Sequence, residues 1–195
     1  MSLQEAIQII QRGGIIIYPT ETIYGLGCDA TNENAVQRLL EIKGRSGENF
    51  KSPPVLIAGQ AQLNLLVEAI PESAGELMHK HWPGALTLVL PARPHLSRLL
   101  IGDGDVPTIG VRETGHAVAH ALCEESGVPL VATSANFSGA TGRASSPQSL
   151  DDIPQELKDK VDFCLDGGIV GGAPSTVVDC TRQPFFILRQ GAVNL

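Results

Sequence analysis

The chain has 195 residues, 43% of them hydrophobic and 18% charged, which is the balance of a single globular domain over residues 1–195. Its formal net charge of −7 disfavours a protein that grips long nucleic acid by neutralising phosphates, because such proteins usually carry a basic surplus. No run approaches the roughly 18 apolar residues of a membrane-spanning helix, and the amino terminus lacks the basic region of a signal peptide, so we expect a cytoplasmic protein with no membrane association.

Hydrophobic periodicity predicts alternating helices and strands. A capping-box pattern at Ser2 and Glu5 begins a first helix, and the apolar residues 15–18 follow it as a buried strand. Either Thr31 or Asn32 can cap the second helix. Further helices are expected at residues 61–68, 72–81, 116–126 and 149–160, and further strands at residues 55–58, 85–90, 108–112, 129–132, 163–165, 176–178 and 185–188. The late strands lie too close together for parallel crossovers, so we expect an α/β layer fold with a mixed sheet.

The most informative segment runs from residue 19 to residue 27, directly after the strand at 15–18. It combines two threonines, a glutamate and a tyrosine with Gly25 and Gly27, at the end of a strand where open α/β sheets commonly bind ligands. The two glycines fit backbone that approaches a ligand closely or takes a positive φ. A plain strand-to-helix connection anchored by Tyr24 is the alternative. A structural hairpin is disfavoured, because its turn would not need so many hydrogen-bonding side chains.

Cations recur at the ends of the predicted elements. Lys43 and Arg45 end a helix, where positive charges often only complement the helix dipole. Arg112 and Arg189, however, end two predicted strands, and Lys51 follows shortly after the helix. Because buried cations lose solvation unless they find a partner, this grouping in an acidic chain predicts a pocket for an anion.

Two further segments are rich in small residues. Residues 132–136 form a hydroxyl-bearing turn after an apolar strand, which can offer N–H groups and hydroxyls to a phosphate. Ser134 lacks the flanking glycines of a nucleophile elbow, so a serine nucleophile is not expected. The glycine-rich residues 167–172 lack the Gly-Lys-Ser/Thr of a P-loop, and they are consistent with either a flexible loop or a substrate-covering loop.

Together these segments resemble the YrdC/TsaC family, the threonylcarbamoyl-AMP synthases, over residues 13–191. The motifs that carry the resemblance are Tyr18-Pro-Thr-Glu-Thr-Ile-Tyr-Gly-Leu-Gly27, Lys43-Gly-Arg45, Trp82-Pro-Gly-Ala-Leu-Thr87, Ile109-Gly-Val-Arg112, Thr133-Ser-Ala-Asn136, Pro174-Ser-Thr-Val-Val-Asp179 and Leu188-Arg-Gln-Gly191. The resemblance implies a YrdC-like α/β fold, built on a twisted, open sheet of mixed parallel and antiparallel strands with flanking helices and a concave positive cleft. It also implies the short, single-domain form, without the carboxyl-terminal domain of the longer members.

The resemblance further implies a nucleotidyltransferase reaction. In it, L-threonine, bicarbonate or CO₂, and ATP give L-threonylcarbamoyladenylate and pyrophosphate, with Mg²⁺ alongside ATP. The intermediate would pass to the enzymes that transfer the threonylcarbamoyl group to the tRNA adenosine next to the anticodon, and weak binding of tRNA or other RNA is left open. Such phosphorus chemistry needs alignment and charge neutralisation more than a protein nucleophile, which agrees with the lack of a convincing catalytic triad.

Residue roles follow by matching these motifs to the family. L-threonine would be held by Thr22, Arg112 and Ser175, with Thr20 as the alternative to Thr22. ATP would be held by Lys43, Arg45, Lys51, Thr108, Ala132, Ser134, Asn136 and Arg189. Of these, Lys43 and Arg45 would be catalytic, through their charges.

Two points stay open within the resemblance. Residues 46–52 depart from the family's usual spacing, and Lys51 is chosen there over Asn49 and Ser52 for the nucleotide-facing role. The Mg²⁺ ligands are not assigned, and Glu21, Asp29 and Asp179 all remain candidates.

Two other functions fit the same fold. One is an RNA-binding module, which the acidic charge and the 4% aromatic content weaken, because RNA recognition relies on phosphate contacts and base stacking. The other is a paralogue that uses a different carbamoyl acceptor, which assays with other amines would separate from the threonine enzyme.

Overall fold

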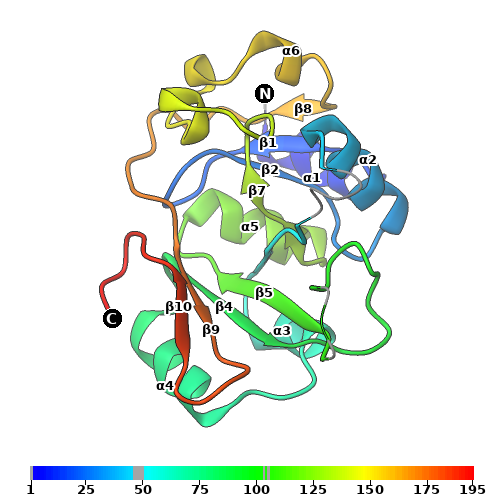
Figure 1. Ribbon diagram of the computed structural model, residues 1–195. Helices are drawn as coiled ribbons and strands as arrows, with labels where there is room; N and C mark the ends of the chain where they lie inside the picture. Colours follow the sequence, from blue (N-terminus) through cyan, green and yellow to red (C-terminus); the bar gives the residue numbers. More distant parts are fainter. Residues whose placement is uncertain (1, 46–50, 103, 105) are drawn as a thin grey trace.

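The structure is a computed structural model that describes residues 2–45, 51–102, 104 and 106–195 (Figure 1). The α-helices are α1 (Leu3–Gln11), α2 (Glu33–Lys43), α3 (Gln60–Leu66), α4 (Glu72–His81), α5 (Ala117–Ser126) and α6 (Gln155–Lys158), and two short 3₁₀ turns are η2 (Gly142–Ser145) and η3 (Leu150–Asp152). The strands are β1 (Ile16–Tyr18), β2 (Gly25–Gly27), β3 (Val55–Ile57), β4 (Leu86–Pro91), β5 (Thr108–Glu113), β6 (Leu130–Val131), β7 (Thr133–Ser134), β8 (Phe163–Cys164), β9 (Thr176–Asp179) and β10 (Phe186–Arg189).

The strands form two mixed sheets. The larger has the order β10-β9-β4-β5-β3-β6, with parallel pairing at β9–β4 and β5–β3, and the smaller has the order β7-β2-β1-β8, with parallel pairing at β1–β8. The α/β class and the mixed pairing predicted from the sequence are confirmed. In Figure 1 the smaller sheet lies with α1, α2 and α6 in the upper part of the molecule, and the larger sheet lies with α3 and α4 in the lower part.

The sequence predicted one sheet, and the division into two arises at residues 130–134. This segment was expected as one strand running into a turn. Instead, β6 pairs with β3 in the larger sheet and β7 pairs with β2 in the smaller one. Between them, the N–H of Ala132 donates to the carbonyl of Pro54 at 2.8 Å. A single short segment therefore joins the two sheets.

The hairpin formed by β1 and β2 corrects the expectation for residues 19–27. The two strands pair antiparallel, with Tyr18 opposite Gly25, so the disfavoured hairpin is present and Gly25 and Gly27 belong to a strand. Glycine is required at Gly27 because a Cβ there would overlap the carbonyl oxygen of Val131 and lie 2.7 Å from the Tyr18 ring. The backbone of Gly27 thus lies close to other protein atoms, and the polar side chains of the segment lie in the turn between the two strands.

Helix boundaries follow local capping. The side chain of Asn32, rather than that of Thr31, accepts from the backbone of α2, and Gly44 ends this helix in the left-handed conformation at φ 69°. The expected helix at 149–160 is instead divided into η3 and α6, because Pro154 between them has no N–H to continue the helical bonding.

Strand β1 and the residue before it are buried on both faces. Ile15 and Ile17 join the main core with residues of both sheets, whereas Ile16 and Tyr18 pack with α1 and α5. The turn that follows β1 therefore begins from a fixed point. Within the described ranges, the helices are too short or too polar for any of them to cross a membrane.

Candidate functional site

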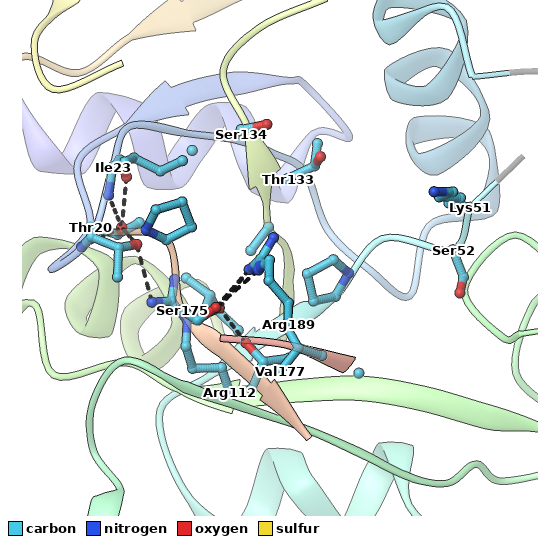
Figure 2. Close-up of a pocket in the computed structure, with 18 of the residues that line it drawn as sticks. Thr20, Ile23, Lys51, Ser52, Arg112, Thr133, Ser134, Ser175, Val177 and Arg189 are labelled. Carbon is cyan, nitrogen blue, oxygen red and sulfur yellow. Dashed lines mark hydrogen bonds between the residues drawn. The ribbon is translucent and has the colours of Figure 1, made fainter. Parts of the chain in front are cut away.

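A cavity of about 570 Å³ lies between one face of the larger sheet and the turn at residues 19–24. Ile109 and Val111 of β5 pack in the core. Side chains alternate between the two faces of a strand, so Thr108 and Arg112 face the cavity. Figure 2 shows Arg112 and Arg189 pointing from the larger sheet into the space that Thr20 and Ser134 border.

The structure brings nine of the eleven expected site residues to this one cavity. They are Thr22, Arg45, Lys51, Thr108, Arg112, Ala132, Ser134, Ser175 and Arg189. Asn136 instead lines a second hollow, which shares Arg45, Lys51, Ser134 and Ser145 with the first. Lys43 lines neither of them.

Arg112 is held by the hairpin turn. Its Nη1 donates to Glu21 Oε1 at 3.1 Å and to Thr22 Oγ1 at 3.3 Å, and the Arg112 side chain is only 7% exposed. The Oγ1 of Thr20 instead donates to the carbonyl of Ile23 at 2.7 Å, which ties it to the backbone of the turn. Both threonines line the cavity, but Thr22 is the one that contacts the arginine.

Arg189 is held by β9. Its Nε and Nη2 both donate to the carbonyl of Ser175, at 3.1 and 2.9 Å, and Nη2 also lies 3.2 Å from Ser175 Oγ. Burial, with the Arg112 guanidinium adding to it, lowers the pKa of Arg189. The Oγ of Ser175 lies 2.8 Å from Oγ1 of Thr87, a cavity residue that the sequence analysis did not assign. Its signal was a lone hydroxyl between two leucines on an otherwise apolar strand.

Lys43 lies outside the cavity and contacts the turn at residues 134–136, which borders it. The side chain is fully buried at the end of α2, and its Nζ donates to the carbonyl oxygens of Ser134 and Asn136 at 2.5 and 2.8 Å. It also donates to Asn136 Oδ1 at 2.7 Å, and Asn136 Nδ2 donates to the carbonyl of Ser145 at 2.9 Å. Desolvation, with the nearby Arg45 charge, lowers the pKa of Lys43 to about 7. Lys43 therefore holds the turn at residues 134–136 to α2.

Arg45 and Lys51 both line the cavity, and in the sequence they flank residues 46–50, which lie outside the described residues. Burial lowers the pKa of the Arg45 guanidinium, whereas Lys51 is exposed. Ser52 lines the cavity beside Lys51, as Figure 2 shows, and the alternative Asn49 lies outside the described residues.

The glycine-rich segment at residues 167–172 is fixed to the hairpin turn. Tyr24 donates its hydroxyl to the carbonyl of Gly168 at 2.8 Å and accepts from the N–H of Gly167 at 2.9 Å. A Cβ on Gly172 would lie 3.2 Å from the carbonyl oxygen of Glu21, so backbone packs on backbone there. Pro174 and Ser175, which follow the segment, then line the cavity.

The charges of the cavity suit a polyanion. Four cations, namely Arg45, Lys51, Arg112 and Arg189, line it together with threonine and serine hydroxyls, and in the described part of the chain no carboxylate does so. All described residues of the chain together contain no group of three or more His, Cys, Asp or Glu side chains that could hold a metal ion. A volume of this size accommodates a nucleotide or another ligand of similar bulk.

The sequence matches a known family and is similar to proteins of named function. Residues 8–191 match a family model for the Sua5, YciO and YrdC proteins, which is described as "Telomere recombination". The chain is 41% identical over 192 residues to the threonylcarbamoyl-AMP synthase of Pyrococcus abyssi, covering 97% of this chain and 54% of that protein. It is 42% identical over 185 residues to the threonylcarbamoyl-AMP synthase of Idiomarina loihiensis, covering 93% of this chain and 95% of that protein.

The fold is also similar to that of a solved Sua5 structure. The crystal structure of P. abyssi Sua5 complexed with L-threonine is similar with a TM-score of 0.88 and 39% sequence identity, over 97% of this chain and 54% of that chain. The chain thus spans about half the length of its P. abyssi relative and nearly all of its I. loihiensis relative.

Proposed function

The chain belongs to the Sua5/YciO/YrdC family, and on that premise we propose that it is a threonylcarbamoyl-AMP synthase. The enzyme would combine L-threonine, bicarbonate and ATP into L-threonylcarbamoyladenylate and release pyrophosphate. The observation that carries the proposal is that residues from nine separate stretches of the sequence, between Thr20 and Arg189, line one cation-rich cavity. The names of the two relatives and the threonine bound to P. abyssi Sua5 support it. In this proposal residues 1–195 form one YrdC-like domain, and the cavity is its positive cleft.

In this proposal the amino acid binds at the end of the cavity nearest the hairpin turn. Arg112 is the cation for the threonine carboxylate, because a guanidinium fork matches two carboxylate oxygens. Thr22 and Ser175 supply hydroxyls on either side of it. The contact between Thr22 Oγ1 and Arg112 Nη1 at 3.3 Å favours Thr22 over Thr20 for this role.

The nucleotide would occupy the remainder of the cavity. Arg45, Lys51 and Arg189 would neutralise the phosphates, and Arg45 would be catalytic where negative charge builds up. The other proposed ATP contacts come from Thr108, Ala132, Ser134 and Asn136. Lys43 would act on the nucleotide through the turn at residues 134–136, to which its ammonium is bonded.

The proposed reaction has two steps. The neutral amine of threonine attacks the carbon of bicarbonate, and the N-carboxylate forms as water leaves. One oxygen of this carbamate then bonds to the α-phosphorus, while the bond from that phosphorus to the bridging oxygen of pyrophosphate breaks. Preorganised cations lower the barrier of the second step because they stabilise charge that spreads over the phosphate oxygens. A carbamate is unstable in bulk water, so the first step benefits from an enclosed cavity.

Mg²⁺ would enter with ATP as part of the substrate. The described lining residues offer cations and hydroxyls, and none of them is a carboxylate, the group through which proteins usually hold Mg²⁺. The labile product would pass, in the cytoplasm, to the enzymes that place the threonylcarbamoyl group on the tRNA adenosine next to the anticodon.

The proposal is tested by incubating the protein with MgATP, labelled bicarbonate and one amino acid at a time. Pyrophosphate release that depends on L-threonine, with label appearing in an adenylate, is the expected result. A stronger dependence on serine, glycine or another amine would identify a different carbamoyl acceptor. Absence of release with every amine, together with tight and salt-sensitive RNA binding, would favour the RNA-binding module.

A further inference from the structure

The hydrogen bonds of Arg112 divide its guanidinium into two parts. Nη1 carries two hydrogens, and two oxygens accept from it, Glu21 Oε1 at 3.1 Å and Thr22 Oγ1 at 3.3 Å. Within the described part of the chain, no protein oxygen accepts from Nε or Nη2 of Arg112. These two nitrogens lie on the same edge of the planar group and present two parallel N–H bonds, the arrangement that a carboxylate accepts as a fork.

The carboxylate of Glu21 is itself fixed at both oxygens. While Oε1 accepts from Arg112, Oε2 accepts from Thr114 Oγ1 at 2.8 Å. Thr114 is fully buried, its N–H donates to the carbonyl of Ile57 at 3.3 Å, and its Oγ1 also accepts from the N–H of His116 at 3.2 Å. Arg112 lies in β5 and Thr114 directly follows this strand, two residues further on, and both side chains reach Glu21. Glu21 bridges both of them from the hairpin turn.

From this geometry we infer that Glu21 is a positioning residue for the amino-acid substrate. It engages Nη1 of Arg112 and so turns the Nε–Nη2 edge towards the substrate carboxylate. The inference rests on the proposed function, which supplies that carboxylate. Glu21 does not line the cavity, so its effect passes through Arg112 rather than through contact with the substrate.

A purely structural ion pair between the same side chains has different consequences. Both partners are largely buried, with 7% and 19% of their side-chain surfaces exposed, so breaking the pair would also weaken the fold. A structural role, however, would affect the binding of every ligand alike. The positioning role concerns one edge of one guanidinium, and its loss affects only ligands that place a carboxylate there.

The test compares the purified wild-type protein with Glu21→Gln and, as a matched control, Glu113→Gln. Glu113 is a neighbouring carboxylate on β5 that does not line the cavity. Calorimetric titration with L-threonine, L-threoninamide and a non-hydrolysable ATP analogue gives three dissociation constants for each protein. Threoninamide lacks the carboxylate and therefore cannot use the Arg112 fork. A second variant, Thr114→Val, removes only the hydroxyl that fixes Glu21 Oε2 and serves if Glu21→Gln does not fold.

The expected result is that Glu21→Gln weakens L-threonine binding by about tenfold, the scale of one misplaced charge-assisted contact, and leaves the other two ligands unchanged. Thr114→Val should shift threonine binding in the same direction by a smaller factor. Threonine binding in both variants equal to that of wild type and Glu113→Gln would overturn the inference, as would equal weakening of all three ligands. A wild-type protein that does not bind L-threonine would instead reject the proposed function itself.

Discussion

Replacing Lys43 by methionine is expected to destabilise the protein by an amount that grows with pH. Methionine fills a similar volume but removes the donor that serves the two carbonyl oxygens and the amide oxygen at residues 134–136. The Ser134 carbonyl keeps the N–H of Asn136 at 2.8 Å, and Asn136 Oδ1 keeps the Ser134 hydroxyl at 2.9 Å. Among the described residues, the Asn136 carbonyl is then left without a donor. A buried oxygen in that state costs about 1–3 kcal/mol, and removal of a buried charge offsets part of this cost. The variant should therefore be less stable than wild type at pH 7.

The pH dependence follows from the pKa of Lys43, which is about 7 in the fold and about 10.4 in an unfolded chain. Between these values the unfolded state binds more protons, so the free energy of unfolding of the wild type rises with pH. The slope is at most about 1.4 kcal/mol per pH unit, and it vanishes below pH 7, where both states carry the proton. Lys43→Met lacks the group, so the stability difference between the two proteins should widen from pH 7 to pH 10.

Urea denaturation at pH 6, 7, 8 and 9 measures this difference directly. Lys51→Met is the matched control, because Lys51 is exposed and its loss should change stability by no more than about 0.5 kcal/mol at any pH. A difference between wild type and Lys43→Met that stays constant or shrinks as pH rises would mean that folding does not lower the pKa of Lys43.

Three further outcomes are expected. Arg45→Ala should raise the activation barrier for pyrophosphate release by about 2–4 kcal/mol without loss of fold, and near-wild-type turnover would contradict its proposed role. Gly27→Ala should destabilise the protein by about 1–3 kcal/mol in thermal or urea melts, because the added Cβ would overlap the carbonyl oxygen of Val131. The control Gly75→Ala, where the helix α4 leaves open space for a Cβ, should stabilise the protein by roughly 0.5–1 kcal/mol. The protein should take up protons when it binds an ATP analogue at pH 8, because phosphates bound in the cavity would raise the pKa of Lys43, which burial lowers in the free protein. Calorimetric heats of binding that do not depend on the ionisation enthalpy of the buffer would contradict this prediction.

The sequence indicated which side chains gather at one cavity better than it indicated the strand pairings. Arg112 and Arg189 lie where apolar runs give way to polar residues, and strand ends of this kind are visible in a sequence because the side chain that leaves the core changes character. Ser175 precedes its strand and was assigned only through the family resemblance. Local periodicity does not specify which strands pair, since pairing depends on segments far apart in the chain. The single sheet expected from the sequence therefore became two, with the division at Ala132.

The hairpin and the role of Lys43 show why local signals were insufficient. The polar residues at 20–24 were interpreted as evidence against a hairpin, although a hairpin turn can also carry the side chains of a site. Gly25 and Gly27 do not take the positive φ that the sequence analysis offered, and both make room for the Tyr18 ring. Gly25 also lines the cavity, whereas Gly27 does not. Lys43 ends a helix beside Arg45, but its position in the sequence does not reveal that its ammonium turns inward to residues 134–136.

A crystal structure with L-threonine and a non-hydrolysable ATP analogue bound together would show whether both substrates share the cavity. We expect both ligands in the one cavity, with the threonine carboxylate on Arg112 and the phosphates near Arg45 and Arg189. Ligands found on separate faces of the molecule, or a threonine carboxylate that does not contact Arg112, would contradict it.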